Sequence, residues 1–115
     1  MEAVERWLEI EALPTGKVLR IAVLDLDDET LQLVAYLKDG TNLRITEQWE
    51  QATLRRYSYY WLTADNHLKI GWDNAPHHAN LVTFPHHKHI ERQDNLADSS
   101  ETCLEEVLAF LSLAE

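Results

Sequence analysis

The chain has 115 residues, with 10 Lys and Arg against 20 Asp and Glu, so its formal net charge is −10. This length suits one domain, and we predict a single domain over residues 1–115. No apolar run approaches the ~18 residues that span a membrane. The one cysteine, Cys103, excludes an internal disulfide framework and a cysteine-based zinc site.

Charge is spread unevenly along the chain. The acidic residues near Met1 replace the basic-then-apolar order of a signal peptide, which favours a cytoplasmic protein with no membrane association. The overall acidity argues against sequence-blind binding of nucleic acid. Residues 51–90, however, contain two acidic and four basic residues and all six histidines. A local anion-binding cleft in an acidic body is compatible with this pattern.

The first two-thirds of the chain predicts a helix followed by antiparallel strands. Apolar residues between Glu2 and Leu13 have helical spacing. Apolar and polar residues then alternate in strand-like segments separated by turns, of which Asp39-Gly40 is the strongest hairpin signal. The predicted strands cover residues 18–26, 31–37, 43–46, 54–62 and 68–72. We expect a meander of four or five strands.

The last third predicts a loop and a second helix. Residues 73–85 contain two prolines and a histidine pair, which favours a loop. Residues 104–111 place apolar side chains on one helical face, and Asp98, Ser99 and Ser100 are candidate caps. The predicted fold is therefore α+β, a single antiparallel sheet with an N-terminal and a C-terminal helix.

The aromatic strand at residues 54–62 is a candidate nucleic-acid surface. Alternation puts Arg55, Tyr57, Tyr59 and Trp61 on one face. Tyr and Trp beside Arg form a surface that stacks bases and contacts phosphate. The alternative is that these residues are good strand formers that cover the sheet.

Histidines are concentrated in the segment that follows the predicted strands at residues 54–62 and 68–72. Five of them fall within residues 77–89, after Asp73 and Asn74, and alternation puts His87 and His89 on one face. Cleaving RNA requires a base for the 2′-hydroxyl, an acid for the leaving oxygen and a cation for the phosphate, which two histidines and an Arg or Lys can supply without a metal or other cofactor. A metal site formed by the same side chains is the alternative.

These considerations define two sets of candidate residues for a ribonuclease. The predicted catalytic set comprises His77, His78, His86, His87, His89 and Asp73. The predicted phosphate- and RNA-binding set comprises Arg55, Arg56, Lys88, Tyr57, Tyr59, Trp61, Trp72 and Asn74. A non-catalytic interaction module, with an acidic surface that meets a basic partner, is a third interpretation.

The chain also resembles a known family. Residues 57–61, the stretch from Trp72 to His78, and the stretch from Thr83 to His89 are similar to the signature of the TumE-like family. These are small prokaryotic proteins of toxin–antitoxin systems. The resemblance implies a toxin paired with a cognate antitoxin, a small DNA-binding protein, and leaves self-association into a homo-oligomer open. The ribonuclease interpretation rests on the residues alone.

The two prolines predict how the histidines come together. Pro76 and Pro85 bracket the loop and fix its φ angles. We expect His77 or His78 to lie near His87 or His89, Asp73 to orient one imidazole, and Arg55 or Arg56 to open into the same cleft.

Overall fold

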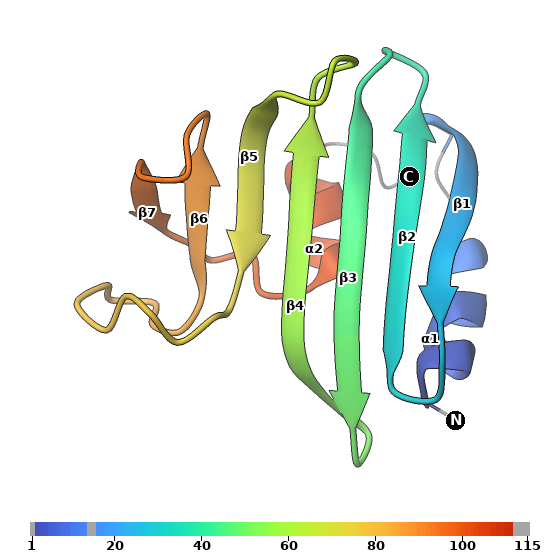
Figure 1. Ribbon diagram of the computed structural model, residues 1–115, viewed down its shortest axis with the longest axis horizontal. Helices are drawn as coiled ribbons and strands as arrows, with labels where there is room; N and C mark the ends of the chain where they lie inside the picture. The colour runs from blue at the N-terminus through green and yellow to red at the C-terminus, as the bar shows by residue number, and fades with distance from the viewer. Residues whose placement is uncertain (1, 14–15, 112–115) are drawn as a thin grey trace.

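A computed structural model describes residues 2–13 and 16–111 (Figure 1). Its strands follow one another along the chain, with one helix before them and one after them. The helices are α1 (Glu2–Glu11) and α2 (Leu104–Phe110), at the two ends of the described chain. Between them lie β1 (Val18–Leu26), β2 (Thr30–Leu37), β3 (Asn42–Glu50), β4 (Thr53–Leu62), β5 (Leu68–Asp73), β6 (His87–Ile90) and β7 (Leu96–Asp98).

All the strands form one antiparallel sheet in the order β1-β2-β3-β4-β5-β6-β7. The α+β class is as predicted, but the prediction of four or five strands is wrong because the sheet has seven. The two additional strands, β6 and β7, lie between the predicted loop and the predicted second helix, where the sequence analysis assigned no element. β6 has four residues and β7 has three. Such short segments contain too few apolar residues to show the apolar–polar alternation that predicts a strand. β6 is a strand because it pairs with β5.

The apolar core lies on one face of the sheet, which both helices cover (Figure 1). We call this face the helix side. Leu31, Leu33, Leu43 and Ile45 point to it and are almost fully buried, as their alternation predicts. Helix α2 adds Leu104, Val107 and Leu108, which are also buried.

Local signals at the turns and caps agree with the structure only in part. Gly40 in the β2–β3 turn has φ +90°, a conformation that glycine adopts without strain. The predicted caps of the second helix are wrong. Asp98 ends β7, and the N-cap of α2 is Cys103, with no side-chain cap bond. Instead, the Glu106 carboxylate accepts the backbone N–H of Thr102 at 2.7 Å.

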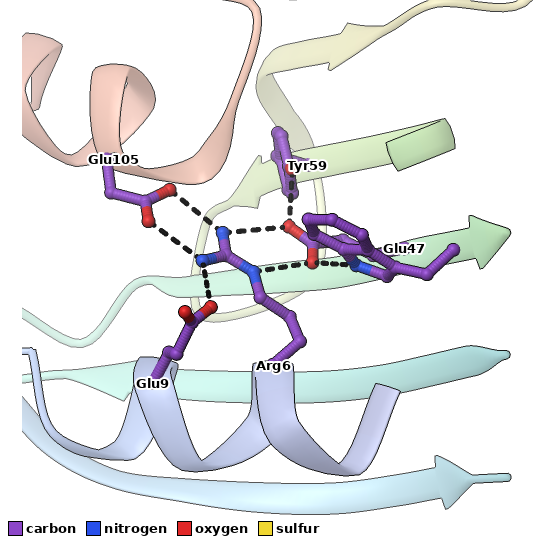
Figure 2. A network of polar contacts seen from close by, with 6 residues as sticks. Arg6, Glu9, Glu47, Tyr59 and Glu105 are labelled. Atoms are coloured by element: carbon purple, nitrogen blue, oxygen red, sulfur yellow. Dashed lines mark hydrogen bonds and ion pairs between the residues drawn. The ribbon is translucent and has the colours of Figure 1, made fainter. Parts of the chain in front are cut away.

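A buried ion network joins both helices to the sheet (Figure 2). Arg6 of α1 donates to the two carboxylate oxygens of Glu47 on β3 at 2.8 and 3.2 Å. Its terminal nitrogens also donate to Glu105 of α2, both at 2.8 Å. Glu47 is fully buried and accepts two more bonds, from Trp49 Nε1 at 2.9 Å and from the Tyr59 hydroxyl at 2.6 Å. We call these residues the Arg6 network.

In the Arg6 network, each carboxylate oxygen of Glu47 and Glu105 accepts a hydrogen bond from an N–H or O–H group. Burial alone would lower the pKa of Arg6, but its bonds to Glu105 and Glu47 outweigh that effect and raise the pKa. Burial and the Glu47 carboxylate raise the pKa of Tyr59 well above its ordinary value. Both groups therefore keep their protons and remain donors to the carboxylates.

The other face of the sheet carries no helix in the described chain, and we call it the open face (Figure 1). Strand register places three exposed arginines on it, Arg20, Arg44 and Arg56. Arg20 packs over the Tyr36 ring, 4.2 Å from its centroid. Neither helix of the described residues is long and apolar enough to span a membrane.

Candidate functional site

The candidate site lies on the open face where β5 ends beside β6. Asp73 pairs with His87 in the β5–β6 register, and Gly71 pairs with His89. Because side chains alternate along a strand, His87 and His89 point to the open face together with Asp73. Lys88, between them, points to the helix side and lies 3.3 Å from Glu101. Alternation in the sequence thus predicted the histidine pair correctly.

Asp73 bridges the two histidines. Its Oδ1 lies 2.8 Å from Nε2 of His87, and its Oδ2 lies 3.2 Å from Nε2 of His89. The two imidazole rings are 5.0 Å apart between centroids. All three side chains are nearly enclosed, with exposed fractions of 2% for His87, 8% for His89 and 13% for Asp73. We call these three residues the Asp73 cluster.

The second nitrogen of each imidazole is held by the backbone. Nδ1 of His87 lies 3.0 Å from the carbonyl oxygen of Pro85, and Nδ1 of His89 lies 2.8 Å from that of Gln93. A carbonyl oxygen only accepts, so each Nδ1 carries the proton and donates. This contact fixes both ring orientations and directs both Nε2 atoms at one carboxylate, an arrangement typical of metal-binding histidines.

His78 completes the surroundings of the Asp73 cluster. Its ring centroid lies 5.0 Å from that of His87 and 6.4 Å from that of His89, and the side chain is partly exposed. This confirms the expectation that His77 or His78 approaches His87 or His89. His77 is exposed, and its ring centroid lies 6.3 Å from that of His78.

His86 occupies a different environment. Its Nδ1 lies 2.9 Å from the hydroxyl of Tyr57, and the two rings stack at 5.8 Å. Tyr57 belongs to the core on the helix side. The structure therefore separates His86, together with Lys88, from the group formed by His78, His87 and His89.

An open cleft of about 520 Å³ adjoins Asp73 on the open face. Its lining comprises Thr30, Thr46, Gln48, Arg56, Tyr57, Ser58, Asp73 and Ala75. Of the two arginines predicted to reach the site, Arg56 lines this cleft. Arg55 is exposed, and its carbonyl oxygen accepts the side-chain amide of Asn74 at 3.1 Å. Asn74 also accepts the backbone N–H of Tyr57 at 2.9 Å, so it holds the end of β5 against β4.

The aromatic residues predicted to stack bases point mostly into the core. Tyr57, Tyr59 and Trp72 have exposed fractions of 4%, 0% and 0%, and Trp72 donates through Nε1 to Glu101 at 3.1 Å. Trp61 is partly buried and lies beneath Lys69, whose Nζ is 4.6 Å from the ring. Tyr57, Tyr59 and Trp72 therefore offer no free aromatic surface, because they pack in the core on the helix side.

Tyr60 lies near the site, although the sequence analysis assigned it no role. Its ring is 6.4 Å from that of His89. Gly71 pairs with both residues, and a Cβ at Gly71 would lie 3.0 Å from the Tyr60 ring, so glycine makes room for it. Burial raises the pKa of Tyr60, and the nearby Asp73 carboxylate raises it further. The place of Tyr60 beside His89 follows from the register of β4 with β5, which no pattern in the sequence specifies.

Comparison with protein-family models gives one match, to the model described as toxin TumE, over residues 13–113. The chain belongs to the TumE toxin family. Searches of curated proteins and of solved structures found no match. The part matched by the TumE model contains the whole Asp73 cluster and the open cleft, whereas Arg6 lies outside it. The predicted resemblance is thus confirmed, and the chain is a toxin component.

Proposed function

We propose that this TumE-family toxin acts in the cytoplasm on RNA and cleaves its phosphodiester bonds at the Asp73 cluster. The observation that carries the proposal is the convergence of two buried imidazoles on one carboxylate, beside an open cleft that Arg56 also lines. Buried ionisable groups that converge at a cleft are typical of reactive sites, because they are expensive to maintain without a function.

The open face supplies what an RNA strand requires. The exposed arginines Arg20, Arg44 and Arg56 offer guanidinium groups to phosphates, and Arg56 lines the cleft that ends at Asp73. His78 is the cluster's accessible neighbour and is the group best placed to exchange a proton with a bound phosphodiester. Tyr60 stays protonated and adds a hydroxyl donor near His89.

The partner in this proposal is a cognate antitoxin, a small DNA-binding protein. The TumE family match supports a toxin component, and a toxin of a toxin–antitoxin pair implies an antitoxin partner. A net charge of −10 favours a basic surface on that partner.

Growth during expression without a partner tests the dependence on the cluster. We expect the wild-type chain to arrest growth and His87→Ala or His89→Ala to abolish the arrest. His67→Ala is the matched control, since His67 has an exposed fraction of 80% and lies in the β4–β5 turn. A folded double variant of His87 and His89 that remains fully toxic would remove the cluster from the mechanism.

Purified protein tests the chemistry directly. A labelled single-stranded RNA should be cleaved by the wild type and by His67→Ala, and left intact by His89→Ala. Circular dichroism of each variant verifies that it is folded. Intact RNA after prolonged incubation with a toxic wild-type preparation would contradict cleavage and favour the interaction-module interpretation.

A further inference from the structure

We infer that the Asp73 cluster is a binding site for one divalent transition-metal ion, held by Asp73, His87 and His89. This inference deepens the proposed function and rests on it for its role in RNA cleavage, but the binding of the metal is a separate property. It selects the metal alternative over the metal-independent chemistry expected from the sequence.

The first argument is the balance of donors and acceptors. The Nδ1 protons of His87 and His89 are used by backbone carbonyls, so in each neutral ring Nε2 presents a lone pair. Both lone pairs face an Asp73 carboxylate, which also only accepts. Three acceptor groups, the two Nε2 atoms and the carboxylate, therefore face one another, with Nε2-to-oxygen distances of 2.8 Å for His87 and 3.2 Å for His89. A cation bound among them satisfies all three groups.

The alternative occupant is a proton on one Nε2, which would join that ring to Asp73 as a hydrogen-bonded ion pair. One proton serves one ring and leaves the other Nε2 facing the carboxylate without a donor, whereas a metal ion can take both nitrogens and the carboxylate as ligands. Asp73 is already oriented by the backbone N–H of Ala75, which donates to Oδ1 at 3.0 Å. The carboxylate is thus fixed in place as a ligand would be.

The geometry suits a first-row metal. The three candidate ligand atoms lie within 4.8 Å of one another. Ligands at about 2.0–2.2 Å from a zinc-like ion lie roughly 3–4 Å apart, which small shifts of these side chains provide. Among the residues that the structure describes, this is the one group of three or more His, Cys, Asp or Glu side chains placed for a metal.

The ligand set also indicates the class of metal. Two imidazole nitrogens and one carboxylate favour Zn²⁺, Mn²⁺, Fe²⁺, Co²⁺ or Ni²⁺ over Mg²⁺ and Ca²⁺, which prefer oxygen ligands alone. Three protein ligands leave coordination positions free for water or a phosphate oxygen, as catalytic rather than structural sites do. The open cleft beside Asp73 and the partly exposed His78 lie where such a ligand would enter.

Metal titration of the purified full chain tests this inference. After dialysis against a chelator, calorimetry with ZnCl₂ and separately with MnCl₂ should give one site per chain, and the ion should raise the melting temperature. Asp73→Asn, His87→Ala and His89→Gln should each weaken binding by on the order of 100-fold or more. His67→Ala and His86→Ala are matched controls that should bind like the wild type.

A second readout distinguishes the cluster from surface histidines. Co²⁺ bound to the wild type should give a visible absorption spectrum that His67→Ala retains and His89→Gln lacks. No binding of any of these ions at 100 μM, a concentration on the order of weak protein sites, would overturn the inference. Binding that survives in a folded double variant of His87 and His89 would also overturn it.

Failure of the metal site and failure of the proposed function give different results. One bound ion without RNA cleavage supports the site and contradicts the proposed function. RNA cleavage that persists in EDTA, with no metal retained, overturns the metal's role in cleavage and supports cleavage by the imidazoles themselves, while the titrations alone decide whether the site binds a metal.

Discussion

The two faces of the sheet each bury a carboxylate, and the two carboxylates are bonded in opposite ways. On the helix side, Glu47 accepts bonds from Arg6, Trp49 and Tyr59, so each oxygen faces donors (Figure 2). On the open face, Asp73 faces two nitrogens whose protons are used elsewhere. The comparison shows that burial of a polar group does not by itself mark a functional site. The imbalance of donors and acceptors at Asp73, which Glu47 does not share, is the reason that we propose a site at Asp73 and not at Glu47.

The two clusters also differ in the span of chain that they join. Arg6 and Glu105 are 99 residues apart in sequence, whereas His89 and Asp73 are 16 apart. The Arg6 network connects α1, the sheet and α2. The Asp73 cluster belongs to one hairpin-like unit of β5 and β6. We therefore expect the first to control global stability and the second to control function.

The largest effect on stability should come from Arg6→Met. It removes the cation and leaves the fully buried Glu47 without its charge partner, which costs about 3–5 kcal/mol. Chemical denaturation measures the loss, and zinc affinity of the folded fraction should stay at the wild-type value. An unchanged denaturation midpoint would show that the network does not hold the helices.

A smaller loss should follow from Tyr59→Phe. This change removes only the hydroxyl that donates to Glu47 at 2.6 Å, with the ring still packed in the core. A buried hydrogen bond to a charged group contributes about 1.5–3 kcal/mol. Denaturation of Tyr59→Phe beside Tyr60→Phe gives a matched pair from neighbouring positions of β4, and the latter should lose less.

The Asp73 cluster should behave differently in the metal-free protein. His89→Gln removes one of the facing acceptors, so its cost without metal should be about 1 kcal/mol or less. With saturating Zn²⁺ the wild type should gain stability and the variant should not. If metal-free His89→Gln loses as much stability as Arg6→Met, the Asp73 cluster is a structural element like the Arg6 network.

The smallest effect should come from Glu105→Gln. The hydrogen bond from Arg6 lowers the pKa of Glu105, but the carboxylate is 48% exposed and water screens the pair. Its contribution should be at most about 1 kcal/mol. Because the pKa is lowered in the folded state, this contribution is present above the ordinary value near 4.5 and is lost as the pH falls through the folded pKa.

The measurement for Glu105→Gln is stability against pH between roughly 3 and 7, compared with the wild type. The two curves should approach each other at the acidic end. A difference that grows as the pH falls would contradict the assigned sign.

Periodicity predicts most of the fold and part of the candidate site. Alternation and helical spacing identify both helices and the first five strands, and alternation places His87 and His89 on one face. It cannot say which face of β4 the helices cover, because both faces carry aromatic residues. Tyr57 and Tyr59 were therefore predicted as a binding surface, whereas they belong to the core.

The Arg6 network could not be predicted from the sequence at all. Arg6 and Glu47 are residue types that usually lie at the surface, and α1 carries several acidic residues with which an arginine could pair. Only the packing of α1 across β3 brings Arg6 to Glu47. An ion pair between residues 41 positions apart in the sequence produces no periodic pattern from which it could be predicted.

The sequential order of the strands has a consequence for synthesis. Each strand pairs with the one made just before it, so β1 to β4 can associate while the later residues are still within the ribosome. His87 and His89 emerge only with β6, and Glu105 reaches Arg6 only with α2. A chain synthesised only as far as β4 therefore holds a partial sheet that lacks both the Asp73 cluster and the contact between Arg6 and Glu105.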